Sequence, residues 1–322
     1  MNKRKNITWL AAIAMACILI LAAFIVISYV THFKESERQT GFTVIDDYGR
    51  AVTVPKNPQR IISLAPGCTE IIFAVGLGTR VVGVDDYSNH PEAAKNITKI
   101  GSYLNPNLEV IISLEPDLIL SSDMTSKEYI SNLEEKNFTV FVLAPKTVQG
   151  IIRDIILVGA IGNKTKEANN LVKSLEQRIR AIISKTSNPN MYRPRVYVEY
   201  YPYWSYGPES IGDDLISMAG GKNIAGSTAT TYSEITNEFV VGSNPEIIVL
   251  TVGPHASTTI KDIKGRIGWD KFDAVKNNKI CTIDDDIISR PGPRIMDALE
   301  HLTRLIHPEL FSLEREKYDN RF

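Results

Sequence analysis

The chain has 322 residues, which at roughly 100–200 residues per domain indicates two domains or one large one. Its 36 basic and 37 acidic residues give a formal net charge of −1, which argues against non-specific nucleic-acid binding, since that requires a basic excess. The content of 43% hydrophobic and 23% charged residues is that of a globular protein, and three cysteines without C-x-x-C spacing exclude a disulfide scaffold and a zinc site of that type.

The N-terminus carries an apolar run that is long enough to cross a bilayer. Basic residues at positions 3–5 precede it, and it extends from Trp9 to Val30. About 20 helical residues span the hydrocarbon core, whereas the apolar part of a secretory signal peptide has roughly 7–15. We therefore predict an uncleaved signal anchor over residues 1–31, with the following chain on the extracytoplasmic side. Cleavage, and lipid attachment at Cys17, remain alternatives.

The chain after a polar tether, residues 32–41, has the texture of an α/β protein. Phe42 to Val54 alternates around the turn signal Asp47-Tyr48-Gly49-Arg50, which predicts a β-hairpin. Short β-branched runs then alternate with helical stretches, which is typical of βαβ units and a mostly parallel sheet. The expected strands cover residues 61–64, 81–84, 118–120, 140–143, 196–199, 247–251 and 280–283.

A long helix is expected between two groups of strands. Residues 164–185 contain no Gly or Pro and carry an apolar stripe with a period of 3.6 residues, and Asn163 is placed to cap them. At 1.5 Å per residue the helix is about 33 Å long. We therefore expect α/β lobes over residues 42–162 and 189–311, joined by a stiff helix over residues 163–188 and followed by a tail over residues 312–322.

An internal echo supports two lobes built on one plan. The stretch from Asn107 to Leu120 resembles the stretch from Asn237 to Leu250 when one gap is allowed. Each predicts a short helix, a proline turn and a buried strand. Two lobes of this kind leave a ligand cleft between them.

The motifs of several enzyme classes are missing from the sequence. Gly76-Leu77-Gly78 lacks the third glycine of a dinucleotide fingerprint and follows a helical stretch. There is no G-x-S-x-G, no H-E-x-x-H and no P-loop, and no two histidines are spaced i, i+4. We interpret Asp284-Asp285-Asp286 as a solvated strand end. We therefore expect a protein that is not an enzyme, with no catalytic residue, no metal site and no intrinsic cofactor.

Several motifs in a fixed order carry a resemblance to a known family. They are Arg60-Ile-Ile-Ser-Leu-Ala-Pro-Gly-Cys-Thr-Glu-Ile-Ile-Phe-Ala-Val-Gly-Leu-Gly78, Val81-Val-Gly-Val-Asp-Asp-Tyr-Ser88, Gly101-Ser-Tyr-Leu-Asn-Pro-Asn107, Leu114-Glu-Pro-Asp117, Gly220-Gly-Lys-Asn-Ile224, Asn244-Pro-Glu-Ile-Ile248 and Arg290-Pro-Gly-Pro-Arg294. With these motifs the chain resembles the substrate-binding proteins of ABC importers for vitamin B12 and iron(III)-siderophores, over about residues 42–310.

The resemblance implies a class III periplasmic binding protein, with two Rossmann-like lobes joined by a long helix and a ligand in the cleft. It implies a membrane permease and a separate ATPase subunit as partners, and a small molecule rather than nucleic acid as ligand. The pattern at residues 87–91 looks more like the corrinoid branch, so we expect a vitamin B12-like cargo. A ferric siderophore or haem is the close alternative, and a surface enzyme or a sensor on the same fold is a distant one.

Members of this family usually carry one acidic residue near the tip of each lobe, where it meets arginines on the permease. By position these residues fall on Glu70 and Glu238. Charge pairs across such a rim steer docking and fix its orientation more than they add affinity. The alternative for Glu70 is a structural carboxylate in the first turn of a helix, where the helix dipole favours a negative charge.

The resemblance also implies which residues contact the ligand. In vitamin B12-binding members aromatic side chains and loop backbones line the cleft, and the matching positions here are Pro66, Tyr87, Tyr103, Trp204 and Tyr232. Stiff aromatic rings suit a macrocycle because they give a large contact area at little cost in side-chain entropy.

An arginine at the cleft is a further candidate ligand contact. Arg290 can pair with a ligand carboxylate or phosphate through its forked guanidinium. The alternative is a structural ion pair with the nearby aspartates. For Arg294 we expect a role in bracing the following helix.

Overall fold

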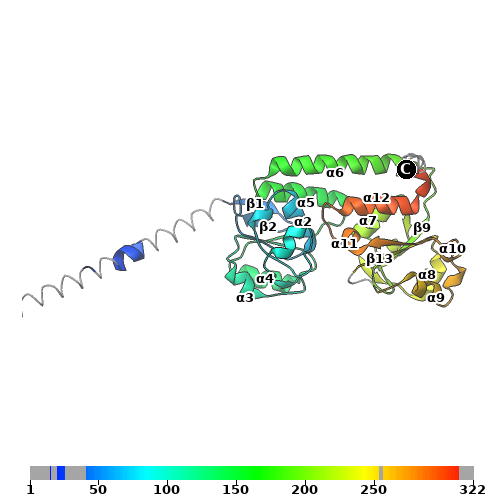
Figure 1. Cartoon of the computed structure of the whole chain (residues 1–322), viewed down its shortest axis with the longest axis horizontal. Helices are drawn as coiled ribbons and strands as arrows, with labels where there is room; N and C mark the ends of the chain where they lie inside the picture. Colours follow the sequence, from blue (N-terminus) through cyan, green and yellow to red (C-terminus); the bar gives the residue numbers. More distant parts are fainter. Residues whose placement is uncertain (1–14, 16–19, 26–40, 254–256, 312–322) are drawn as a thin grey trace, which may run out of the picture.

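Two lobes lie side by side beneath one long helix (Figure 1). The computed structural model of the chain describes residue 15 and residues 20–25, 41–253 and 257–311. The expected anchor, tether and tail, including Cys17, fall wholly or mostly outside these residues. Within the described part of the chain, no helix is both long and apolar enough to cross a membrane.

A β-hairpin opens the first lobe, as predicted. Strands β1 (Phe42–Ile45) and β2 (Ala51–Val54) pair antiparallel. The Asp46 carboxylate holds the turn, because it accepts the backbone N–H groups of Tyr48 and Arg50 and pairs with the Arg50 guanidinium at 2.6 Å. It also accepts the N–H of Val142, so the turn is fixed to the edge of the neighbouring sheet.

The first lobe contains a parallel sheet with the strand order β4-β3-β7-β8. Its strands carry Ile, Leu and Val on both faces because helices cover both. Helices α2 and α5 pack on one face, and α3 and α4 pack on the other. The bounds are β3 (Ile61–Ser63), β4 (Val81–Val84), β7 (Leu118–Ser121), β8 (Val140–Val142), α2 (Pro66–Ala74), α3 (Leu108–Ser113), α4 (Lys127–Glu135), α5 (Val148–Ile161) and the small hairpin of β5 (Gly101–Ser102) and β6 (Asn105–Pro106).

The second lobe repeats this plan with the parallel order β11-β9-β13-β14. Helices α7 and α12 cover one face, and the segment from α8 to α10 covers the other. The bounds are β9 (Arg195–Glu199), β11 (Lys222–Asn223), β13 (Ile247–Val252), β14 (Ile280–Asp284), α7 (Ile211–Met218), α8 (Asn237–Ser243), α9 (Ile260–Gly265), α10 (Asp273–Lys276), α11 (Asp285–Ser289), α12 (Ile295–Ile306) and the hairpin of β10 (Trp204–Tyr206) and β12 (Tyr232–Glu234). Short 3₁₀ helices cover Gly78–Arg80, Glu92–Asn96, Ile224–Ser227, Trp269–Lys271 and Pro308–Phe311.

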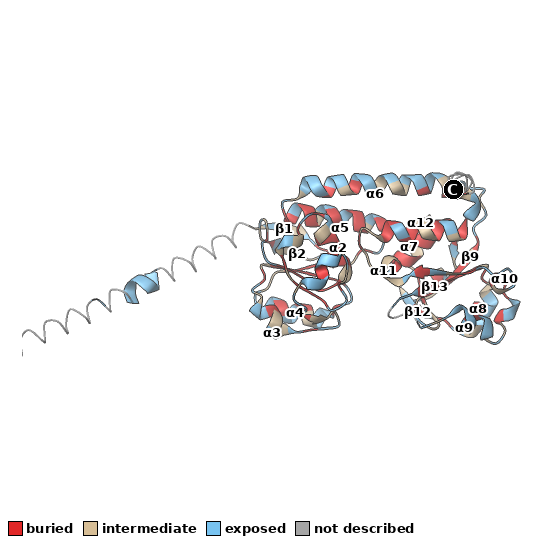
Figure 2. Cartoon of the chain, in the orientation of Figure 1, coloured by how far each residue is buried: buried red, intermediate tan, exposed pale blue. Residues whose placement is uncertain are grey.

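The long helix α6 (Thr165–Thr186) has 22 residues and lies over both lobes (Figure 1). Its buried residues, including Val172 and Leu175, belong to one core that continues through α5, α7 and α12. Figure 2 shows exposed residues along α6 and mostly buried residues along α5 and α12. The helix was expected, but its cap was not: Lys164 is the N-cap residue, and Asn163 lies in the preceding turn with φ +56°.

The internal echo corresponds to the same three elements in each lobe. In the first lobe α3 leads through Pro116 into β7, and in the second α8 leads through Pro245 into β13. Both short helices lie at the ends of the lobes that are farthest from α6 (Figure 1). The two lobe tips are therefore structurally equivalent.

Candidate functional site

A cavity of about 590 Å³ lies between the two lobes. Much of its lining follows the carboxyl ends of parallel strands, namely β3, β4, β7 and β8 in the first lobe and β9 and β14 in the second, and the small hairpins of both lobes add Tyr103, Tyr206 and Tyr232. Ligands of open α/β sheets bind at this edge, because the loops that leave it converge there. The volume falls within the roughly 300–1,000 Å³ of small-molecule sites.

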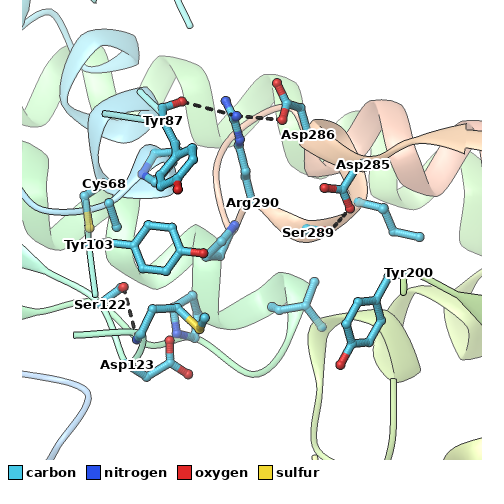
Figure 3. A pocket seen from close by; sticks show the side chains of 18 of the residues that line it. Cys68, Tyr87, Tyr103, Ser122, Asp123, Tyr200, Asp285, Asp286, Ser289 and Arg290 are labelled. Carbon is cyan, nitrogen blue, oxygen red and sulfur yellow. Dashed lines mark hydrogen bonds and ion pairs between the residues drawn. The ribbon is translucent and has the colours of Figure 1, made fainter. Parts of the chain in front are cut away.

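Tyrosine rings from both lobes form the walls of the cavity. Tyr87 and Tyr103 in the first lobe have ring centroids 5.3 Å apart. In the second lobe the ring centroid of Tyr206 lies 5.0 Å from that of Tyr200 and 6.3 Å from that of Tyr232. Figure 3 shows Tyr87 and Tyr103 across the cavity from Tyr200. Desolvation raises the pKa of Tyr200 and Tyr232 to about 12, so both phenols are neutral hydrogen-bond donors at physiological pH.

The structure brings together five of the six residues that were expected to contact the ligand. They are Pro66, Tyr87, Tyr103, Tyr232 and Arg290, all of which line the cavity. Their position supports a contact role, and the contacts themselves stay a prediction.

Trp204 is not among the residues that line the cavity. Its backbone N–H donates to the carbonyl of Tyr201 at 2.7 Å, which closes a tight turn in which Tyr203 has φ +64°. The turn leaves Trp204 in the β10–β12 hairpin opposite Glu234. The cavity is instead lined by Tyr200, Tyr201 and Tyr206, which the resemblance did not single out although their segment is conspicuously aromatic.

Arg290 borders the cavity but is already engaged within the chain. Its guanidinium pairs with Asp286 at 2.6 Å, donates to Asn89 Oδ1 at 2.6 Å and to the Tyr87 carbonyl at 3.3 Å, and its side chain is 11% exposed. Figure 3 shows this arginine between Tyr87 and Asp286. The structure therefore contains the ion pair that was the alternative to a ligand contact.

Glu70 is a buried carboxylate, and its burial contradicts the predicted role in permease docking. It is 3% exposed, and both its oxygens accept hydrogen bonds from Arg294, at 3.1 and 2.5 Å. It is the fifth residue of α2, so it does not lie in the first helical turn either. Arg294 reaches across to the other lobe instead of bracing its own helix. A carboxylate satisfied in this way inside the chain does not reach the arginines of a partner.

Glu238 lies where the prediction placed it, exposed in the first turn of α8 at one lobe tip. The internal echo aligns its neighbourhood with that of Glu109, which is exposed in the first turn of α3 at the other tip. The two tips therefore present an equivalent pair of carboxylates. The repeat of this stretch in the sequence is the signal that identifies Glu109 as the counterpart of Glu238.

The charged groups that line the cavity are mostly acidic. Asp123 follows β7, Asp285 and Asp286 follow β14, and Arg290 is the basic residue of the lining. Desolvation by the surrounding atoms raises the pKa of the Asp123 carboxyl, although its side chain is exposed. No three His, Cys, Asp or Glu side chains in the described ranges are grouped so that they could hold a metal ion.

Comparison with known proteins places the chain in a family. A family model described as periplasmic binding protein matches residues 61–287. The chain belongs to the periplasmic binding protein family. The uncharacterized ABC transporter substrate-binding lipoprotein YvrC of Bacillus subtilis (strain 168) is 32% identical to it over 277 residues, which cover 84% of this chain and 86% of that relative.

Two further comparisons concern vitamin B12-binding proteins. The vitamin B12-binding protein of Vibrio vulnificus (strain CMCP6) is 28% identical over 250 residues, which cover 76% of this chain and 88% of the relative. The crystal structure of the periplasmic vitamin B12 binding protein BtuF of Vibrio cholerae superposes with a TM-score of 0.70 at 24% identity, covering 78% of this chain and 98% of that one. This likeness shows that the α/β fold with two parallel sheets is that of a class III periplasmic binding protein.

Proposed function

We propose that this chain is the substrate-binding component of an ABC importer and that its cargo is a corrinoid. The observation that carries the proposal is the cavity between the lobes, with tyrosine rings on both walls. Rigid aromatic walls provide a large contact area for a stiff macrocycle, and neutral phenols donate hydrogen bonds to the amide side chains of a corrinoid. The names of the Vibrio vulnificus and Bacillus subtilis relatives agree with this role.

In this role the chain makes and breaks no bonds. It binds the cargo outside the cytoplasm and hands it to a permease, while a separate subunit hydrolyses ATP. The residues proposed to dock on the permease are Glu109 and Glu238, because both carboxylates are exposed at equivalent lobe tips. The N-terminal segment is proposed to hold the protein at the membrane, either as an anchor or through a lipid, as the word lipoprotein in the name of one relative supports.

The test is a calorimetric titration of the purified protein with cyanocobalamin. We expect one-to-one binding that weakens at least about fivefold in Tyr232→Ala, since truncating an aromatic residue in a binding cavity costs about 1–3 kcal/mol. Trp204→Ala is the matched control, because Trp204 shares the β10–β12 hairpin without lining the cavity, and we expect less than a threefold change, roughly 0.6 kcal/mol.

Ferric siderophores and haemin are titrated in parallel. Tight binding of one of these and no binding of cyanocobalamin would keep the transport role and replace the cargo. Absence of binding to all of them would overturn the proposal.

A further inference from the structure

Among the described residues, the charged side chains that line the cavity are mostly acidic. Three aspartates, Asp123, Asp285 and Asp286, face one arginine, Arg290. Arg290 is neutralised by Asp286 at 2.6 Å, and the buried Glu70 carboxylate lies 3.8 Å from it. The Arg290 guanidinium, which was expected to bind an anionic group of the ligand, is therefore already paired with a carboxylate of the chain itself. The other charged side chains of the described lining are acidic.

Asp123 is a carboxylate of this lining that carries no ion pair with any described lysine or arginine, whereas Asp286 pairs with Arg290 and Asp285 accepts a hydrogen bond from Ser289 at 2.8 Å. It lies in the loop after β7, and Figure 3 shows it beneath Tyr103 on the wall of the first lobe. The nearby cation, Lys146, pairs with Glu209 at 3.0 Å, so its charge is shared at the rim. Desolvation and the neighbouring Asp47 raise the pKa of Asp123, while its own backbone N–H and Lys146 lower it, and the side chain remains exposed. A hydrogen-bond donor or a cationic group of the ligand would therefore interact favourably with the Asp123 carboxylate.

An anionic ligand is repelled by the same carboxylates. Coulomb interactions strengthen as water is expelled from a cavity, so a carboxylate or catecholate placed near Asp123 and Asp285 is repelled more strongly than it would be in bulk water. Unpaired like charges are a general means by which a site rejects wrong ligands. The lining therefore discriminates by charge in addition to shape.

We infer that Asp123 is a specificity-determining residue that selects cargo of zero or positive net charge, with a hydrogen-bond donor or cationic group on its carboxylate. The inference rests on the proposed function and adds the charge class of the substrate. Corrinoids fit this class, because their periphery carries neutral amides and the form without the nucleotide phosphate is a cation. Haem, with two propionates, and ferric tricatecholates, with a net negative charge, do not fit it.

The experiment compares two corrinoids that share the macrocycle and differ in net charge. Purified full-length protein is titrated calorimetrically with cyanocobalamin, which is neutral, and with aquacyanocobinamide, which is cationic. We expect Asp123→Asn to weaken cobinamide binding about five- to tenfold and cyanocobalamin binding less than threefold, and to reduce the salt dependence of cobinamide binding. Asp86→Asn is the matched control, because Asp86 is an exposed carboxylate of the same lobe that does not line the cavity, and it should change neither affinity.

Three further ligands separate failure of this inference from failure of the proposed cargo. If both corrinoids bind and Asp123→Asn leaves the ratio of their affinities unchanged, the inference is overturned and the proposed function stands. If no corrinoid binds, cationic ferrioxamine and an anionic ferric tricatecholate decide: binding of the cation alone supports charge selection with another cargo. Binding of the anion, or of haemin, by the unmodified protein overturns the inference, and binding of none overturns both.

Discussion

Glu70 and Arg294 join the two lobes through a two-pronged ion pair. The Arg294 Nε and Nη2 atoms donate to the two carboxylate oxygens at 3.1 and 2.5 Å. Two glycines let the lobes approach this closely, since a Cβ at Gly67 would lie 2.9 Å from the Pro291 carbonyl and one at Gly292 would lie 3.0 Å from Glu70 Oε2. The bond therefore links α2 directly to the start of α12 beside the cavity.

Removing one partner of this pair is expected to destabilise the protein. Arg294→Met leaves the Glu70 carboxylate buried, with Arg290 at 3.8 Å as its nearest remaining cation. Because an uncompensated buried charge is costly, we expect the free energy of unfolding to fall by about 2–4 kcal/mol. Urea denaturation measures it. Arg180→Met is the control, because Arg180 forms an exposed pair with Glu176 and should cost less than about 1 kcal/mol. Equal losses in both variants would contradict the structural role.

Arg266 fixes the loop that supplies the tyrosines of the second lobe. Its guanidinium binds both oxygens of the buried Glu199, at 2.6 and 2.9 Å, and lies 4.0 Å from the Tyr203 ring and 4.5 Å from the Trp269 ring. A lysine ammonium group can neither form the paired hydrogen bonds to Glu199 nor stack on the two aromatic rings as a planar guanidinium does. We expect Arg266→Lys to lower the free energy of unfolding by about 2 kcal/mol and to weaken cargo binding, because Tyr203 belongs to the turn beside Tyr200.

The control for this change is Arg195→Lys in the same lobe. Arg195 pairs with Glu246 at 3.1 Å at a more exposed position, so we expect its replacement to cost less than about 1 kcal/mol. Calorimetry reports binding, and near-ultraviolet circular dichroism reports the packing of the Tyr203 and Trp269 rings. An unchanged dichroism spectrum in Arg266→Lys would count against the proposed positioning.

Asp154 makes stability depend on pH. This side chain is fully buried, its Oδ2 atom has no hydrogen-bond partner among the described residues, and burial together with Asp47 raises its pKa to about 8. A carboxyl whose pKa is higher in the folded state contributes stability that is complete below about pH 4 and is lost as pH rises toward 8. We expect Asp154→Asn to be more stable than the unmodified protein at pH 8 by about 1–3 kcal/mol.

Unfolding free energies of both proteins at pH 5 and pH 8 provide the measurement. The gain from Asp154→Asn should be clearly smaller at pH 5, where the folded protein already holds the proton. Parallel stability curves across this pH range would show that Asp154 does not titrate as described.

The carboxylates at the lobe tips are expected to act in transport and not in binding. Reversing both charges, Glu109→Lys with Glu238→Lys, places like charges against the arginines of a permease, which costs several kcal/mol. We expect cyanocobalamin uptake by cells that depend on this protein to fall at least about tenfold, with unchanged cargo affinity. Glu167→Lys is the control, because Glu167 is also exposed in a first helical turn but lies on α6, away from the tips. Normal uptake by the double variant would refute the docking role.

The strands and the long helix could be predicted because their signals are local. A strand buried on both faces, such as Ile247–Val252, is a short run of β-branched and other apolar residues, and α6 shows its apolar stripe over 22 residues. Glu70 could not be placed in the same way. Its partner Arg294 lies 224 residues away, and the direction of a side chain from α2 is decided by how the lobes meet. Trp204 was misplaced for a related reason, since one tight turn decides which rings of an aromatic segment face the cavity.

The helix α6 joins the lobes and lies over both of them, so separating the lobes has to bend it. Bending a helix lengthens hydrogen bonds on its convex side and is opposed by them. A helix that resists bending in this way limits changes in the angle between the lobes. The shape of the cavity between the lobes is therefore set by α6, which does not line it, as well as by the residues that do.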